Sequence, residues 1–155
     1  MYQRILVALD HTSADGSLLP HVEELARLTG AELLLVHVAD GWAAQWQEHL
    51  NLADSQEIRE DREYLESIAA RLTESGLMVR PLLSQGDPSR EITKLARSQE
   101  CDLIAMTTHG HRFIADFWLG STIDKVRHEA EIPLLLVRAH PLSEPKPKRG
   151  LAARG

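Results

Sequence analysis

The chain has 155 residues, enough for one domain with a substantial core, and its 43% hydrophobic and 26% charged residues are typical of a globular protein. Its net charge of −6 argues against nucleic acid as the main partner, because binding a phosphate backbone needs an excess of lysine and arginine. No apolar run approaches the ~20 residues of a membrane-spanning helix, so we expect no membrane insertion.

Two further features concern the compartment. The first strand is predicted to begin at once, without a charged and then apolar leader, so we expect no signal peptide. The single cysteine, Cys101, excludes an intrachain disulfide and fits the reducing cytoplasm. Cys101 stands just before a predicted strand, where a small buried residue is expected more often than a reactive thiol.

Short apolar runs alternate with amphipathic segments up to residue 138. A short apolar run is typical of a strand buried on both faces, whereas apolar residues three or four apart indicate a helix. Pro20 is tolerated only near a helix start, so the first helix is expected to begin between Asp15 and Leu19. The predicted elements are strands over 4–9, 33–38, 78–83, 103–106 and 134–137, and helices over 17–29, 54–75, 88–99 and from 121 or 122 to the stop at Pro133.

Three helix starts carry capping signals. Asp54 begins a capping-box pattern, and Asp87 can cap a helix whose first residue is Pro88. Ser121 or Thr122 is suited to cap the last helix.

Two segments have no hydrophobic pattern that assigns them to a helix or a strand. In the connector 39–53, Trp42 and Trp46 could pack on one helical turn or form part of a lid. Residues 139–155 hold three prolines and four basic residues against one acidic residue, which is typical of a flexible tail. A solvated end is the first interpretation of this tail, and a basic arm that touches anionic lipid or nucleic acid is the alternative.

Alternating strands and helices indicate a parallel sheet with helices on both faces, joined by right-handed crossovers. We therefore predict an α/β fold with an open five-stranded parallel sheet, in a single domain over residues 1–138. In such a sheet the ligand binds beyond the carboxyl ends of the strands, where the winding reverses. The loops at that edge follow Leu9, Val38, Leu83 and Met106, and the polar and glycine signals lie in these loops.

The stretch 102–138 carries the strongest chemical signal. Gly110 opens a loop after a buried strand, and Gly120-Ser121-Thr122 closes that loop before a helix. Such a turn at a helix start leaves backbone N–H groups free at the positive end of the helix dipole. This arrangement is typical of an anion site, and phosphate is the usual anion.

With these features placed, residues 2–138 resemble a universal stress protein. The resemblance is carried by ILVALD at 5–10, GAELLLVHV at 30–38, GDPSREI at 86–92 and the stretch 102–138. The nucleotide-binding branch of that family is similar in having glycine, two residues, glycine, nine residues, glycine, then Ser or Thr. Here Gly110, nine residues and Gly120-Ser121 match, and Thr107 stands where the pattern has its first glycine.

The resemblance implies the fold predicted above, which is Rossmann-like and similar to that of the adenine nucleotide alpha hydrolases. It also implies a homodimer formed through the last strand and ATP as ligand, often with Mg²⁺ or Mn²⁺. Asp10 would meet the adenine or ribose, Val38 would border the adenine, and Gly86 would let its loop approach the nucleotide. Thr107 could supply a hydroxyl. The residues implied to line the phosphates are Gly110, Gly120, Ser121 and Thr122.

These candidates also have purely structural interpretations. Asp10 can cap the turn after the first strand, and the glycines can serve the conformation of their loops. His109 and His111, with Asp116, lack a third His or Cys at ligand-like spacing, so we predict no metal site there. The chain also lacks a GxxxxGK[ST] P-loop, a GxGxxG after the first strand and a GxSxG nucleophile elbow.

Three functions follow. The first is a dimeric, nucleotide-dependent regulator of the stress response, in which ATP orders the 110–120 loop by population shift. The second is a nucleotide-free interaction protein, in which Thr107 and His111-Arg112-Phe113 fill the crevice. The third is a slow ATPase or autophosphorylating enzyme, which ranks last because no general base is evident beside the phosphate site.

Overall fold

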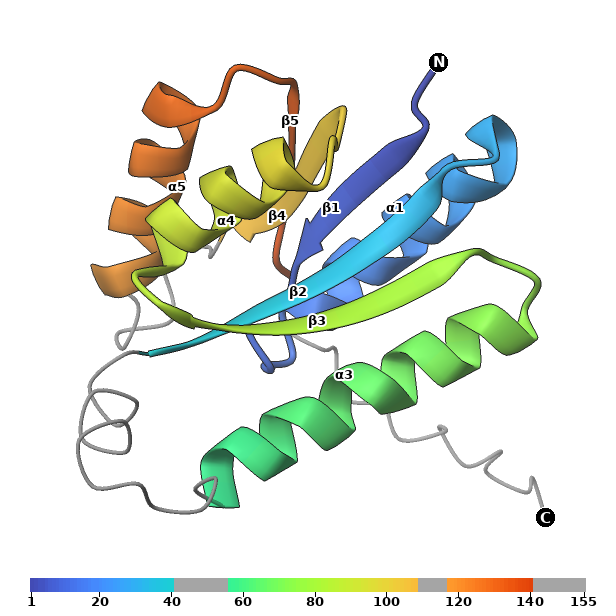
Figure 1. Ribbon diagram of the computed structural model, residues 1–155, viewed down its shortest axis with the longest axis horizontal. Coiled ribbons are helices and arrows are strands. Elements are labelled where there is room, and N and C mark those ends of the chain that lie inside the picture. The colour runs from blue at the N-terminus through green and yellow to red at the C-terminus, as the bar shows by residue number, and fades with distance from the viewer. Residues whose placement is uncertain (41–55, 109–116, 141–155) are drawn as a thin grey trace, which may run out of the picture.

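The computed structural model describes residues 1–40, 56–108 and 117–140, without the side chains of residues 40 and 117–121. One parallel sheet has the strand order β3-β2-β1-β4-β5, and helices cover both of its faces (Figure 1). This confirms the predicted fold class. The strands are β1 (Arg4–Ala8), β2 (Glu32–Asp40), β3 (Val79–Gly86), β4 (Leu103–Thr108) and β5 (Leu134–Arg138). The helices are α1 (Asp15–Thr29), α3 (Gln56–Glu74), α4 (Pro88–Ser98) and α5 (Phe117–Glu129).

The sheet separates two hydrophobic cores. Successive residues of a strand point to opposite faces, so Ile5 packs with α1 and α3 while Leu6 packs with α4 and α5. All the strand residues from Leu33 to Leu35 are buried, as expected of a parallel sheet that is covered on both faces. Each fully buried leucine or isoleucine contributes roughly 1.5–3 kcal/mol to folding.

Most of the predicted elements are confirmed, with shifted ends. The first helix begins at Asp15, and β2 and β3 run further toward their carboxyl ends than predicted. Cys101 is buried, and burial raises the pKa of its thiol to about 11, which suits a packing role. No helix within the described ranges is long and apolar enough to cross a membrane. The predictions for Asp54, for Trp42 and Trp46, and for the tail beyond residue 140 lie outside the described residues.

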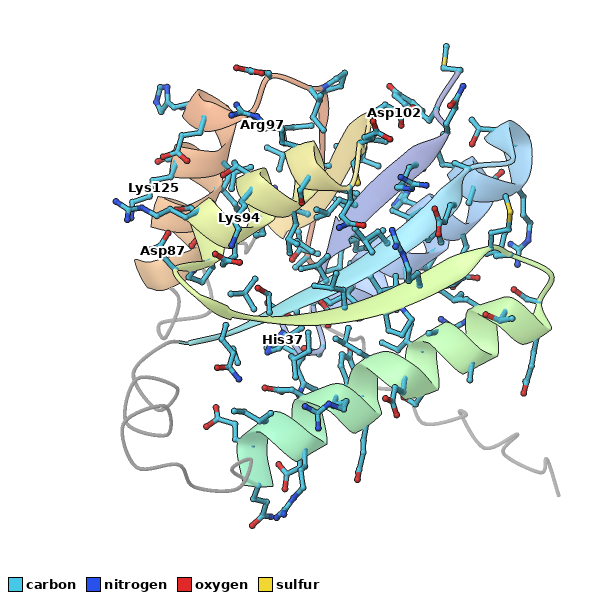
Figure 2. All side chains as sticks on the ribbon, viewed as in Figure 1. His37, Asp87, Lys94, Arg97, Asp102 and Lys125 are labelled. Carbon is cyan, nitrogen blue, oxygen red and sulfur yellow. The ribbon has the colours of Figure 1, made fainter. Side chains whose placement is uncertain are left out.

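The predicted cap of α4 is confirmed. The Asp87 carboxylate accepts hydrogen bonds from the Ser89 hydroxyl at 2.5 Å and from the backbone N–H of Arg90 at 3.1 Å. These two donors, the hydroxyl above all, lower the pKa of Asp87. The ammonium of Lys125 on α5 lies 3.9 Å from the same carboxylate, so the two helices meet at this point (Figure 2).

The predicted start of the last helix is wrong. The helix α5 begins at Phe117, so Gly120, Ser121 and Thr122 lie inside it and do not cap it. Glycine within a helix costs only about 1 kcal/mol relative to alanine, so it need not stop a helix that extends through its neighbours. The first backbone N–H groups of α5, which have no partner within the helix, therefore belong to its start near Phe117.

The loop between β1 and α1 is held by a buried carboxylate, Asp15. It accepts hydrogen bonds from the backbone N–H groups of Asp10 at 3.1 Å and His11 at 3.0 Å, and from the Tyr64 hydroxyl on α3 at 2.7 Å. Burial, followed by the neighbouring charge of Asp10, raises the pKa of Asp15 to about 6. Asp15 thereby fixes the backbone that follows β1.

This raised pKa predicts how stability depends on pH. Because the folded state holds the Asp15 proton up to about pH 6 and the unfolded chain only to about 3.8, the free energy of unfolding should fall as pH rises through this window. Relative to Asp15→Asn, the wild type should lose on the order of 2–3 kcal/mol between pH 4 and pH 6.5, measured by urea unfolding. The control is Glu24→Gln, an exposed change on the same helix. A wild-type slope equal to that of Asp15→Asn would contradict the assignment.

Candidate functional site

A pocket of about 190 Å³ lies at the carboxyl ends of β1, β2 and β4, on the face that α4 and α5 cover. The strand order places this pocket where the winding reverses: the chain runs from β1 outward to β3 on one side and returns to β4 on the other. The first crossovers and the later ones cover opposite faces, so neither layer of the described helices covers the edge between β1 and β4. The pocket therefore lies at the edge where the sequence pattern predicted a ligand site.

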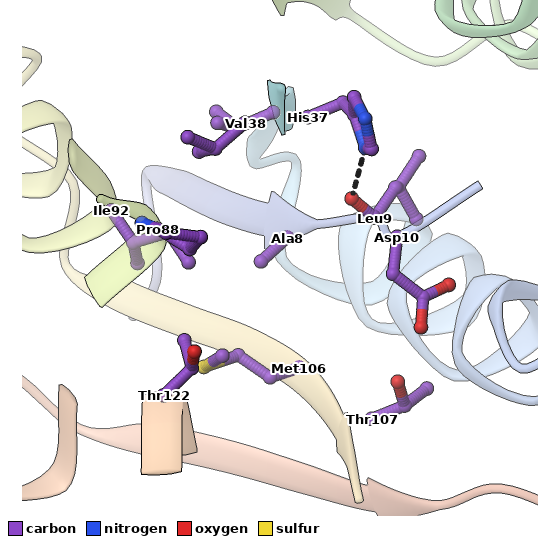
Figure 3. Close-up of a pocket in the computed structure, with 11 residues that line it drawn as sticks. Ala8, Leu9, Asp10, His37, Val38, Pro88, Ile92, Met106, Thr107 and Thr122 are labelled. Atoms are coloured by element: carbon purple, nitrogen blue, oxygen red, sulfur yellow. Dashed lines mark hydrogen bonds between the residues drawn. The ribbon is translucent and has the colours of Figure 1, made fainter. Parts of the chain in front are cut away.

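The walls of the pocket are mostly apolar. Figure 3 shows Val38 of β2 above Ala8 of β1, with Met106 of β4 below and Pro88 and Ile92 of α4 at one end. Val38, Ala8 and Met106 share a face of the sheet because of the strand register: Ala8 pairs with Val36, two residues before Val38, and Val7 pairs with Ala105, so Met106 lies beside Ala8. An apolar slot of this kind suits a flat aromatic group, which buries both of its faces.

The residues that line the pocket also include Asp10, Thr107 and Thr122, all of which were predicted as site residues. Asp10 lies at the opposite end from Pro88 (Figure 3). The Asp10 Oδ1 accepts hydrogen bonds from the Thr12 backbone N–H at 3.0 Å and from the Thr12 hydroxyl at 2.6 Å. Asp10 thus caps the turn after β1 and also lines the pocket.

The other predicted site residues are not brought to this pocket by the described structure. Gly86 ends β3 at a φ of +130°, a conformation that side chains rarely adopt, and a Cβ there would lie 3.4 Å from Glu91 Cγ. The backbone conformation therefore accounts for this glycine. Gly120 and Ser121 are described only as parts of α5, and Gly110 lies outside the described residues, as do His109, His111 and Asp116.

A cluster of histidines and one buried acid adjoins the pocket on the α3 side of the sheet. Asp61 of α3 lies between two imidazoles: His11 Nδ1 is 2.6 Å from its Oδ1, and His37 Nε2 is 3.2 Å from its Oδ2. The other ring nitrogen of His37, Nδ1, lies 2.9 Å from the carbonyl oxygen of Leu9 (Figure 3). The His11 ring stacks on Tyr64 with centroids 4.0 Å apart. His37 lines the pocket, so the cluster reaches its wall.

Sequence reasoning did not identify this cluster. One signal for it was present, because Asp61 falls between Ile58 and Leu65 on the apolar stripe of α3. An acid on the buried side of a helix needs a partner, and histidine is a common one. His37 carries no such signal, since its partners come from the loop after β1 and from α3, which are distant in sequence. Within the described residues, no group of three or more His, Cys, Asp or Glu side chains could hold a metal ion.

Comparisons with known proteins agree with this fold. The model of the universal stress protein family matches residues 1–138. The universal stress protein MJ0577 of Methanocaldococcus jannaschii is 26% identical, over 89% of this chain and 96% of the relative. A universal stress protein of Thermus aquaticus is 31% identical, over 89% of this chain and all of the relative.

Solved structures extend the likeness to three dimensions. The structure of MJ0577 has a TM-score of 0.77 at 28% identity and covers 90% of this chain and 98% of its own. The Archaeoglobus fulgidus universal stress protein in complex with dAMP has a TM-score of 0.66 at 20% identity and covers 88% and 98%. A universal stress protein in complex with cAMP has a TM-score of 0.65 at 18% identity and covers 90% and 98%. Because the family model spans every strand and helix described above, this chain belongs to the universal stress protein family.

Proposed function

We propose that this chain is a regulatory protein that binds an adenine nucleotide, with ATP as the ligand, in the pocket at the ends of β1, β2 and β4. The observation that carries the proposal is the composition of the pocket: apolar walls for a flat base, with a carboxylate at one end for sugar hydroxyls. Val38 would border the adenine, and Asp10 would accept hydrogen bonds from the ribose.

Family structures support the ligand class by analogy. Two solved universal stress proteins that share this fold are complexes with dAMP and with cAMP. At 20% and 18% identity that likeness shows the fold alone. The lining of this chain's own pocket is therefore the main support for an adenine nucleotide as its ligand. We further propose a cytoplasmic location, which the buried single thiol Cys101 supports.

The phosphates would extend from the pocket toward α5. The hydroxyls of Thr107 and Thr122 could donate hydrogen bonds to phosphate oxygens, and the start of α5 would add its dipole. We keep the roles that the family resemblance implies for four more residues. Gly86 would let its loop approach the nucleotide, and Gly110, Gly120 and Ser121 would line the phosphates. Mg²⁺ or Mn²⁺ fits these oxygen donors as an ion carried mainly by the phosphates, since Mg²⁺ usually keeps few protein ligands.

Filling the pocket tests the proposal. Val38→Trp would place a large ring where the base is expected, and it should weaken ATP binding at least about 100-fold, because a packed site has no room for both rings. Isothermal titration calorimetry should give micromolar ATP affinity for the wild type and no measurable heat for the variant. Met78→Trp is the matched control, since Met78 is 59% exposed just before β3 and distant from the pocket in the sheet. Equal heats for wild type and Val38→Trp would reject the proposed site.

A nucleotide-free scaffold is the second candidate, and one observation favours it. The pocket of about 190 Å³ among the described residues is smaller than the ~300–1,000 Å³ of typical ligand sites. If ATP is the ligand, denaturing freshly purified protein should release adenine nucleotide in an amount comparable to the protein, measured by mass spectrometry. Release of no nucleotide, together with no ATP heat, would favour the scaffold.

We also propose that two copies associate through β5. Among the described residues this strand pairs only with β4, and Leu136 on it is 38% exposed, so it offers an apolar side chain and a strand edge to a partner. Leu136→Lys should convert a dimer into a monomer in sedimentation velocity, because the introduced charge would be buried at the interface. Met78→Lys, at an exposed methionine away from that edge, should leave the dimer intact. A monomeric wild type would contradict the association.

A further inference from the structure

His11, the residue directly after Asp10, has a left-handed backbone conformation with a φ of +61°. Residues other than glycine rarely adopt this conformation, because the Cβ then crowds the backbone. A residue stays in such a conformation only where the contacts around it impose it, and such residues are concentrated at functional sites. The contacts of His11 therefore show what fixes the turn between β1 and α1.

Both helices next to the turn hold His11. Its ring stacks on the ring of Tyr64 of α3, with centroids 4.0 Å apart and an angle of 19° between the planes. Its Nδ1 lies 2.6 Å from Oδ1 of Asp61, one helical turn earlier on α3. Its backbone N–H donates a hydrogen bond to Oδ2 of Asp15 on α1 at 3.0 Å. These contacts keep the turn in its strained conformation.

Tyr64 links the contacts to one another. Its hydroxyl donates a hydrogen bond at 2.7 Å to the same Asp15 oxygen that accepts from His11. The other oxygen of Asp15 accepts from the backbone N–H of Asp10 at 3.1 Å, and Asp15 is 1% exposed, so little water reaches its carboxylate. Burial, and then the hydrogen bond to Asp15, raises the pKa of Tyr64, so its hydroxyl keeps the proton that it donates. Tyr64 therefore supports the backbone of both Asp10 and His11.

The position of the Asp10 carboxylate depends on this turn. Its Oδ1 accepts from the backbone N–H and the hydroxyl of Thr12, which belongs to the same turn. Asp10 lines the pocket at the end opposite Pro88 (Figure 3). Tyr64 is not among the described residues that line the pocket, and it packs against the core on the other face of the sheet. A change at Tyr64 would therefore reach the ligand through the turn that carries Asp10.

We propose that Tyr64 is a positioning residue for this pocket: through Asp15 and His11 it holds the turn that presents the Asp10 carboxylate to the sugar hydroxyls of the ligand. This rests on the proposed nucleotide pocket and adds to it a determinant of sugar recognition on the opposite face of the sheet. Without the Tyr64 hydroxyl, Asp15 loses a partner and the strained turn is free to relax. Binding groups must be held to within about 0.5 Å, so contact with the ribose should weaken while the apolar slot for the base stays intact.

The hold on the turn can be tested without a ligand, by amide hydrogen exchange followed by NMR. In the wild type the amides of Asp10 and His11 should be protected, because both donate to a buried carboxylate. Tyr64→Phe keeps the ring that stacks on His11 and removes only the hydroxyl, and it should speed the exchange of both amides about tenfold. The matched control is Tyr2→Phe, at a tyrosine that packs against the same core before β1, which should leave both rates unchanged. Equal rates in wild type and Tyr64→Phe would overturn the proposal.

Sugar recognition is tested by calorimetry with adenosine and 2′,3′-dideoxyadenosine at pH 8, where Asp15, with a pKa of about 6, is ionised. The two ligands share the base and differ only in the hydroxyls that Asp10 would bind. The wild type should bind adenosine about tenfold more tightly, the change expected from one hydrogen bond to a charged acceptor. Tyr64→Phe should reduce this preference to about twofold and leave the Kd of dideoxyadenosine within about twofold of the wild-type value. A merely structural role would weaken both ligands equally, and that result, or an unchanged preference, would contradict the positioning role.

A double-variant cycle shows whether Tyr64 acts through Asp10. Asp10→Ala should bind adenosine about tenfold more weakly than the wild type, and adding Tyr64→Phe should weaken binding no further, because the group that Tyr64 positions is already absent. A further loss in the double variant would show that Tyr64 acts by another route, and the proposal would be wrong.

The same titrations separate this role from the pocket on which it rests. Binding of neither nucleoside by the wild type would reject the nucleotide pocket together with the positioning role. Equal binding of the two nucleosides by the wild type would keep the base slot and reject the sugar contact and the role of Tyr64. A wild-type preference that Tyr64→Phe leaves unchanged would reject the role of Tyr64 alone.

Discussion

The reversal of winding between β1 and β4 is the constraint on which the rest of this structure depends. Right-handed crossovers place α1 and α3 on one face of the sheet and α4 and α5 on the other. At the carboxyl ends of β1 and β4 the crossovers diverge, so neither layer of the described helices closes that edge. Apolar strand residues reach the edge because they are buried all along the sheet, and the loops there supply the polar groups. The position of the pocket therefore follows from the topology of the sheet, and the particular side chains determine only how it is lined.

Many of the strands, helices and caps of this fold could be predicted from local sequence patterns. Apolar runs and helical stripes locate every described strand and helix, because burial on one or two faces leaves a clear period in the sequence. The cap at Asp87 was also predictable, since Asp followed by Pro is a local signal. The start of α5 was not, because the preference of Gly120 for a turn is weaker than the tendency of a helix to continue through it.

The site shows the same division between local and distant signals. Asp10, Val38 and Thr107 end or follow predicted strands, whose carboxyl ends were expected to share one edge of the sheet, and Thr122 stands near the predicted start of the last helix. The family resemblance then named these four residues, and all of them line the pocket. The cluster around Asp61 required knowing that α3 crosses behind β2, which no local pattern specifies. Gly86 was assigned to the ligand on family resemblance, whereas its positive φ gives a backbone reason for glycine at that position.

The two separate cores on opposite faces of the sheet bear on how such a protein can diverge. Most of the apolar residues that line the pocket belong to one core, and the residues that hold α1 and α3 belong to the other. Substitutions in separate cores share few neighbours, and their energetic effects should add rather than compound. Ligand preference could then drift through exchanges beneath α4 and α5 while the opposite layer keeps the chain folded. Adjacent residues of β1 face different layers, so one strand contributes both to the core that keeps the chain folded and to the pocket wall that can accept substitutions.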